Sequence, residues 1–207
     1  MLGYYNYTVV LTYVGMLSSF FGITLAVGGN LWAALLCLMF SGFCDMFDGK
    51  VASTMERTPS QKRFGIQIDS LSDLICFGVL PAIIIFELAP ANKLAGIVSG
   101  LYLLCALIRL AYFNVDEEER QNQTQEARSI YKGLPVTTAA LILPGLFCLH
   151  GLVHQMKLEL FGPILLVCMG LAFLTPFRLR KPGNLGKVVM MVLGVAELLL
   201  LTVGTGI

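Results

Sequence analysis

The sequence predicts an all-α bundle that crosses the membrane about seven times, and three observations support this fold class. The 207 residues are 57% hydrophobic and only 13% charged, whereas soluble domains carry about 25% charged residues. The hydrophobic residues form runs of about 20, the length that an α-helix needs to cross a bilayer. Three very short connections and three longer polar ones separate these runs. A chain of this length fits one domain, 1–207, rather than two.

Taken in order, the predicted spans are 8–28, 31–53, 67–88, 93–115, 134–153, 158–175 and 186–206. Very short connections follow the first, third and fifth spans, so each of these spans should form an antiparallel hairpin with the next. The seventh run contains Glu197 and ends in a Gly-rich stretch. The polar segment 116–131 is typical of a solvated loop or a short surface helix.

The basic residues gather in one set of connections. The longer connections and the adjoining helix ends hold Lys50, Arg57, Lys62, Arg63, Arg120, Arg128, Lys132, Arg178, Arg180, Lys181 and Lys187, and the short ones hold Lys93 and Lys157. The positive-inside rule places the longer connections in the cytoplasm. We expect an integral protein of a bacterial or archaeal cell membrane. The net charge of +1 gives no reason to expect a nucleic-acid partner.

Four aspartates lie at the predicted cytoplasmic ends of two spans, where a charged side chain is costly. Asp45 and Asp48 are three residues apart, and Asp69 and Asp73 are four apart. Both spacings place the two carboxyl groups on one helical face, and the two faces flank the same turn. Oxygen ligands select hard divalent cations such as Mg²⁺, Mn²⁺ or Ca²⁺, and two such ions would balance four carboxylates.

Two other interpretations of these carboxylates remain. Asp45 and Asp69 could cap helix ends or pair with Lys50, Arg57 and Arg63. Carboxylates inside a membrane also form pathways for cations or protons.

Small residues accompany the aspartates. Gly49 and Ala52 follow Asp48 on the same predicted helix, and Gly65 precedes Asp69 by four residues. Such residues allow close helix packing or the approach of a ligand to the backbone, and beside a metal site we favour a ligand. The surrounding basic side chains suit a pyrophosphate or phosphodiester at the membrane surface.

This pattern resembles the signature of the CDP-alcohol phosphatidyltransferases: Asp45-x-x-Asp48-Gly49-x-x-Ala52, then Gly65-x-x-x-Asp69-x-x-x-Asp73. Ser53 departs from it, because the family has an arginine there, and the connection from Ser53 to Gly65 is a few residues longer than usual. Arg57 or Lys62 could supply the missing charge. Residues 69–82, 109–114 and 133–136 are similar to the phosphatidylserine synthase branch, although Tyr112 replaces its second arginine. The resemblance covers about residues 8–145, and 158–207 matches weakly.

The resemblance implies a six-helix core with an added C-terminal helix. It also implies transfer of a phosphatidyl group from CDP-diacylglycerol to L-serine, giving phosphatidylserine and CMP. Asp45, Asp48 and Asp69 would bind two divalent cations, Mg²⁺ or Mn²⁺, and Asp73 would act as general base while facing the second ion. A homodimer surrounded by membrane lipids is expected. The alternatives are a sister enzyme that uses glycerol 3-phosphate or inositol phosphate, and a cation or proton transporter.

Two groups of binding residues follow from these patterns. The CDP-lipid is expected at Thr12, Asp48, Gly49, Ala52, Ser53, Arg57, Lys62 and Gly65. Thr12 enters this group by resemblance only, and helix packing is its alternative role. The acceptor is expected at Arg109, Asn114 and Lys132, because a buried arginine needs an anionic partner. The alternative for Arg109 is that it extends along the span to the interface.

Overall fold

The computed structural model describes residues 3–123, 130–153, 156–180 and 183–204. A 3₁₀ turn, η1 (Tyr7–Val9), leads into α1 (Val10–Val27), which is followed by α2 (Leu31–Ala52). The third helix has three segments: α3 (Pro59–Asp73), a π-helical turn η2 (Leu74–Val79) and α4 (Leu80–Leu88). The remaining elements are α5 (Lys93–Gln123), β1 (Ile130–Lys132), η3 (Val136–Thr138), α6 (Ala139–Leu152), α7 (Leu158–Leu174), β2 (Arg178–Arg180) and α8 (Asn184–Gly204).

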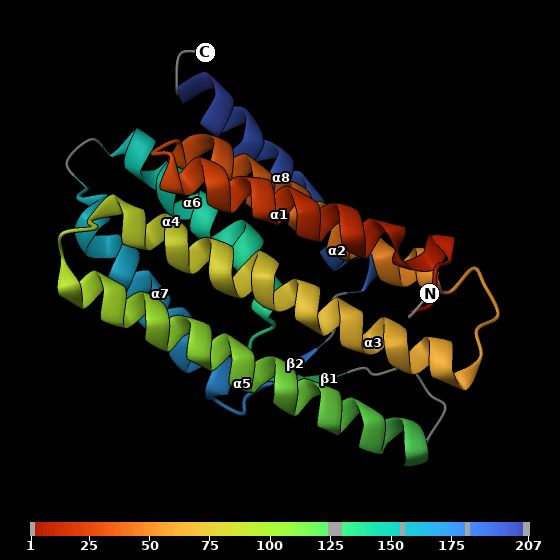
Figure 1. The fold of residues 1–207 in the computed structure, drawn as a ribbon. Coiled ribbons are helices and arrows are strands. Elements are labelled where there is room, and N and C mark those ends of the chain that lie inside the picture. The colour runs from red at the N-terminus through yellow and green to blue at the C-terminus, as the bar shows by residue number, and fades with distance from the viewer. Residues whose placement is uncertain (1–2, 124–129, 154–155, 181–182, 205–207) are drawn as a thin grey trace.

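Within the described residues these elements form seven continuous helices, which confirms the predicted helical bundle (Figure 1). Five are long and apolar enough to cross a membrane, and the helices at 136–152 and 158–174 are shorter but also apolar. The seventh predicted span corresponds to α8. Its Glu197 faces the bundle, because a Cβ added to Gly145 of α6 would lie 3.0 Å from Glu197 Oε1.

The third helix begins earlier than the predicted span 67–88. Thr58 caps it: its hydroxyl oxygen accepts a hydrogen bond from the N–H of Gln61, and the Gln61 side chain accepts one from the N–H of Thr58. Pro59 occupies the first turn, where its missing N–H costs nothing. The predicted basic connection is therefore mostly helical, and only the turn at 53–58 separates α2 from α3.

The fourth helix continues beyond the predicted span 93–115, to Gln123. An ion pair of 2.6 Å between Arg120 and Glu117, three residues apart, supports this extension. Segment 116–131 was predicted to be a loop or a short surface helix. Its first part is helical as the end of α5, and 124–129 lies outside the described residues. An unpredicted two-stranded ribbon follows, in which Tyr131 of β1 pairs with Leu179 of β2.

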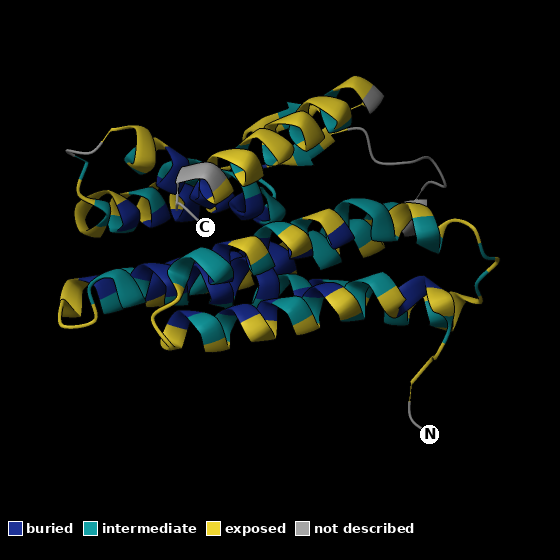
Figure 2. Ribbon diagram, turned by 90° about the horizontal axis from the view of Figure 1, so that it is seen from above, coloured by how far each residue is buried: buried dark blue, intermediate teal, exposed yellow. Residues whose placement is uncertain are grey.

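Small side chains allow the helices to pack closely. Gly42 of α2 meets Ala140 of α6, since a Cβ added to Gly42 would lie 2.5 Å from the Ala140 Cβ. Between α1 and α2, the buried Ser41 hydroxyl donates a 2.8 Å hydrogen bond to the carbonyl oxygen of Gly15. The buried residues lie where helices meet, and exposed residues cover the outer faces (Figure 2).

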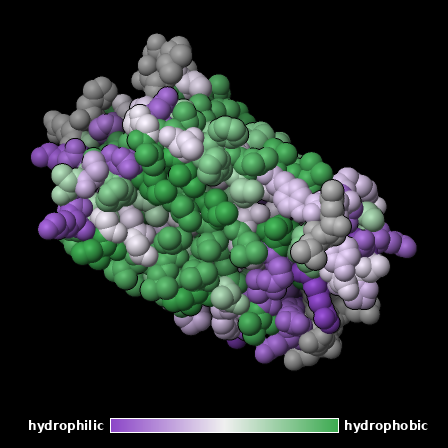
Figure 3. Space-filling model, viewed as in Figure 1, coloured by the Kyte–Doolittle hydropathy of each residue, from purple (hydrophilic) through white to green (hydrophobic). Residues whose placement is uncertain are grey.

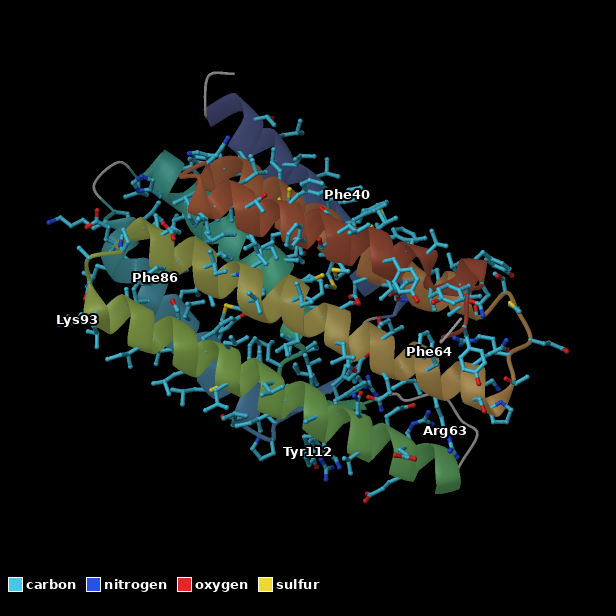
Figure 4. All side chains as sticks on the ribbon, in the orientation of Figure 1. Phe40, Arg63, Phe64, Phe86, Lys93 and Tyr112 are labelled. Carbon is cyan, nitrogen blue, oxygen red and sulfur yellow. The ribbon has the colours of Figure 1, made fainter. Side chains whose placement is uncertain are left out.

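The face seen in Figure 3 carries a broad apolar belt with hydrophilic residues at both of its ends. The exposed apolar side chains of the molecule include Phe20, Phe40, Leu107, Leu171 and Val192. Such a belt is suited to the hydrocarbon of a bilayer. Arg63 and Phe64 lie at one end of the bundle, and Phe86 and Lys93 lie toward the other (Figure 4). Of the basic residues used for the orientation, Arg128 and Lys181 lie outside the described residues.

Candidate active site

Three carboxyl groups meet between the C-terminal half of α2 and the following helix. One oxygen from each of Asp45, Asp48 and Asp69 lies within 4.8 Å of the other two, and all three residues are half-buried. The geometry follows from helical spacing, because Asp45 and Asp48 lie one turn apart on α2 and face α3 across the 53–58 turn. The structure thus brings together residues from both halves of the sequence pattern.

Asp73 lies one turn beyond Asp69, at the end of α3. It lines a narrow cavity of about 10 Å³ together with Asp45, Asp48 and Asp69. The three-carboxylate group does not include it. All four predicted aspartates therefore share one cavity, and Asp73 lines it together with Cys76 and Phe77.

Contacts between α1 and α2 hold this cluster in place. The Thr12 hydroxyl donates to Asp48 Oδ2 at 3.2 Å. One turn further along α1, Gly15 packs against Cys44, the residue before Asp45, with only 3.3 Å between an added Cβ and the Cys44 Cβ. A larger residue at Gly15 would push α2 away. Thr12 thus donates a hydrogen bond to a carboxylate and also lines a second, larger cavity beside it.

The larger cavity has a volume of about 260 Å³ and opens beside the carboxylates. Its lining residues are Thr8, Val9, Thr12, Asp48, Gly49, Ala52, Arg57, Lys62, Gly65, Ile66 and Asp69. The structure places there every residue expected to contact the CDP-lipid except Ser53. Ser53 ends α2 in an exposed position, and its hydroxyl donates to the carbonyl oxygen of Lys50 at 2.7 Å.

Arg57 is the most informative basic residue in this cavity. Its Nε is buried and has no hydrogen-bond partner within the described part of the chain. Its Nη1 would lie 3.1 Å from a Cβ at Gly65, so the glycine leaves room for the guanidinium. A buried donor without a partner is costly, and an anionic ligand in the cavity would satisfy it.

The N-terminal segment contributes residues that the sequence analysis missed. Thr8 and Val9 line the larger cavity, the Tyr7 hydroxyl lies 3.0 Å from Thr54 Oγ1, and Tyr4 packs edge-on against Phe64 with 5.6 Å between ring centroids. Thr8 precedes Thr12 by four residues, and that helical spacing was the available signal. No motif marked the ring contact.

The three residues expected to bind the acceptor line neither cavity. Arg109 is buried, and its Nε donates to the carbonyl oxygen of Leu134 at 3.3 Å. Asn114 Oδ1 accepts a 2.7 Å hydrogen bond from Ser70, the neighbour of Asp69. Asn114 therefore contacts the helix that carries the carboxylates, from the side of α5.

Lys132 lies on β1. Its ammonium forms a 2.6 Å ion pair with Asp116 and lies 5.9 Å from the centroid of the Tyr112 ring. The hydrogen bond to Asp116 raises the pKa of Lys132. This contact ties the ribbon to the end of α5 that is predicted to be cytoplasmic.

The donor set of the cluster fits a hard divalent cation. The ligands are carboxylate oxygens, which suit Mg²⁺ and Mn²⁺, and no thiol or imidazole belongs to the three-residue group within the described residues. Mutual repulsion among close carboxylates also favours a bound cation. Asp45, Asp48 and Asp69 are thus the residues that could hold a metal ion.

The fold and the site define an integral membrane protein of helical type, in which three converging carboxyl groups lie beside a cavity lined by Arg57 and Lys62 at one end of the bundle. The sequence model of the CDP-alcohol phosphatidyltransferases matches residues 5–202. The chain belongs to this family.

Curated relatives carry more specific names. An archaetidylserine synthase of Methanothermobacter thermautotrophicus is 35% identical over 141 residues, covering 68% of this chain and 56% of the relative. A CDP-diacylglycerol–serine O-phosphatidyltransferase of Saccharomyces cerevisiae is 34% identical over 139 residues, covering 61% and 49%. One of the same name from Methanocaldococcus jannaschii is 29% identical over 172 residues, covering 83% and 74%. The chain spans about half the length of the first two relatives.

Proposed function

We propose that this protein transfers the phosphatidyl group of CDP-diacylglycerol to L-serine, forming phosphatidylserine and releasing CMP. The observation that carries the proposal is the meeting of Asp45, Asp48 and Asp69 at the edge of a cavity lined by Arg57 and Lys62. The names of the relatives support serine as the acceptor.

The larger cavity is the proposed site of the CDP head group. Arg57 and Lys62 provide positive charge for the pyrophosphate. Gly49 leaves the backbone open, because no atom lies within 4 Å of a Cβ placed there. The Thr8 and Thr12 hydroxyls offer polar contacts on the wall formed by η1 and α1. Arg57 thereby takes the role of the family arginine that Ser53 replaces.

Asp45, Asp48 and Asp69 would hold Mg²⁺ or Mn²⁺, with Asp73 facing a second ion. Bound ions would neutralise the pyrophosphate and the charge that develops on the transferring phosphoryl group. Thr12 orients Asp48 through its hydrogen bond, and the two helices keep the carboxylates converged.

In the proposed step the serine hydroxyl attacks the phosphorus that carries the diacylglycerol. A bond forms between the serine oxygen and this phosphorus, and the bond from phosphorus to the bridging pyrophosphate oxygen breaks. CMP takes that oxygen and leaves. Asp73 accepts the hydroxyl proton as general base, since the hydroxyl alone is a weak nucleophile. The residues proposed to bind the acceptor are Arg109, Asn114 and Lys132, as in the sequence analysis.

The proposed setting is a bacterial or archaeal cell membrane with the site at the cytoplasmic face, supported by archaeal and bacterial relatives, although a yeast relative also matches. The basic residues at the site end of the bundle support the orientation. A homodimer remains a prediction from the family resemblance.

The test is CMP release by the purified protein in lipid nanodiscs containing CDP-diacylglycerol. Release should require serine and Mn²⁺ or Mg²⁺, and EDTA should stop it. Asp73→Asn should lower turnover by at least about 100-fold, the contribution typical of a positioned base. Asp48→Asn, which removes a proposed metal ligand, should lower it by a comparable factor. Mn²⁺ should also raise the unfolding temperature of the wild type but not that of Asp48→Asn, because only a binding-competent fold gains stability from the ion.

The same assay identifies the acceptor substrate. CMP release with glycerol 3-phosphate or inositol phosphate, but not with serine, would replace serine in the proposal. Cation flux in proteoliposomes that lack CDP-lipid, unchanged in Asp73→Asn, would support a transporter instead.

A further inference from the structure

A π-helical turn begins directly after Asp73. Within η2 the N–H of Leu80 donates to the carbonyl oxygen of Ile75, five residues back rather than four. π-Helical turns are rare and frequently occur at functional sites. This one inserts extra backbone between the helix that carries Asp69 and Asp73 and the buried α4.

The sequence shows that one regular α-helical hydrogen bond is missing at this turn. In an α-helix the carbonyl oxygen of Phe77 would accept a hydrogen bond from the N–H of residue 81. That residue is Pro81, which has no N–H. The Phe77 carbonyl is therefore left without its helical donor, in a segment where Phe77 and Leu80 are fully buried. Buried backbone carbonyls need a partner.

Tyr102 of α5 supplies that partner. Its hydroxyl donates to the Phe77 carbonyl oxygen at 2.7 Å, and the side chain is buried. The Tyr102 ring also packs against Phe173 of α7, with 5.5 Å between ring centroids. The hydroxyl is thus fixed by a neighbouring helix, and it holds the turn at one position of its backbone.

One residue, Phe77, links the hydrogen bond from Tyr102 to the candidate site. Phe77 lines the narrow cavity together with Asp73, Asp69 and Asp45. The backbone from Asp73 to Phe77 is a single short stretch of π-helical turn. A change in the backbone path of this turn would therefore change the orientation of the Asp73 side chain.

We propose that Tyr102 is a positioning residue: its hydrogen bond to the Phe77 carbonyl holds the π-helical turn that sets the orientation of Asp73. The inference rests on the proposed function for its catalytic consequence. Tyr102 itself contacts neither cavity and acts only through the backbone of η2.

The test uses Tyr102→Phe, which removes the hydroxyl and keeps the ring. Turnover at saturating substrates should fall about 10-fold, as for other residues that orient the groups of a site without contacting the substrate. The KM values for serine and CDP-diacylglycerol should stay within about twofold, because the head-group cavity is unchanged. Hydrogen–deuterium exchange should become faster at the backbone amides of residues 74–80. This second measurement needs no substrate.

Ser99→Ala is the matched control. Ser99 is buried on the same helix, and its hydroxyl has no hydrogen-bond partner among the described residues. Ser99→Ala should match the wild type in turnover and exchange.

Unchanged exchange at 74–80 in Tyr102→Phe would overturn the inference whatever the reaction is. So would wild-type turnover in that variant, or an equal loss in Ser99→Ala. A wild-type protein that releases no CMP would contradict the proposed function, and the exchange result would still stand on its own.

Discussion

At the scale of single residues, Arg57 combines three properties that suit a residue that binds an anion. It is a charged group on the wall of a cavity, one of its donor atoms is buried and unsatisfied among the described residues, and a glycine makes room for it. The guanidinium fork suits paired phosphate oxygens better than an ammonium does. Arg57 is therefore the residue whose loss should weaken binding of the donor lipid.

Arg57→Gln should raise the KM for CDP-diacylglycerol about 10-fold with little change in the KM for serine, because a charge-assisted hydrogen bond is worth about 1.5–3 kcal/mol. Steady-state CMP release at varied CDP-lipid measures this. Arg63→Gln is the matched control, since Arg63 is exposed and does not line the cavity. An unchanged KM in Arg57→Gln, or an equal rise in Arg63→Gln, would contradict this role.

Most of what could be predicted about the site came from the spacing of its residues in the sequence. The aspartates and glycines stand at helical intervals, so their common face could be predicted from the sequence alone. Ser53 was expected in the same group because it stands where the related family has an arginine, but it lies past the end of α2 in an exposed position. Tyr102 gave no signal, because its partner is a backbone carbonyl 25 residues away in sequence.

At the scale of helices, apolar length predicted the seven helices, but polar residues hid two helix ends. Pro59 and the Thr58 cap start α3 within a basic stretch, and α5 continues through an acidic one to Gln123. Both extensions lie beyond the apolar runs. There the hydropathy of the sequence does not indicate where a helix ends, because local hydrogen bonds and ion pairs determine the helix boundary. The β1–β2 ribbon was not predictable from either strand alone, since its segments are far apart in sequence.

Gly42 provides the test of helix packing. Gly42→Ala would place a Cβ 2.5 Å from the Ala140 Cβ, so α2 and α6 must separate, and overpacking of this kind costs about 1–3 kcal/mol. We expect a lower unfolding temperature in detergent, measured by loss of helical circular dichroism. Gly100→Ala is the matched control on α5, where no atom lies within 4 Å of the added Cβ. A Gly42→Ala protein as stable as Gly100→Ala would mean that the two helices are not in close contact.

At the scale of the whole molecule, the bundle has two chemically different ends. The site, the α2–α3 turn and the ribbon lie toward the end where most basic residues gather, and the short turns at 28–30 and 89–92 lie at the other. In the proposed reaction the lipid substrate would enter between helices from the apolar belt, and serine would arrive from water. The carboxylates lie near the end of α2 and within the first half of the continuous third helix, where the two proposed reactants would meet.

This arrangement predicts a topology that labelling can check. Ser60→Cys places a thiol at the exposed start of α3, and Ala91→Cys places one in the opposite turn. A membrane-impermeant maleimide should label Ala91→Cys in intact cells and Ser60→Cys only in inside-out vesicles, because the positive-inside rule puts the basic end in the cytoplasm. Leu104→Cys, in the apolar face of α5, should react in neither preparation. The reverse pattern would place the carboxylates outside the cell and would contradict the cytoplasmic site of the proposed function.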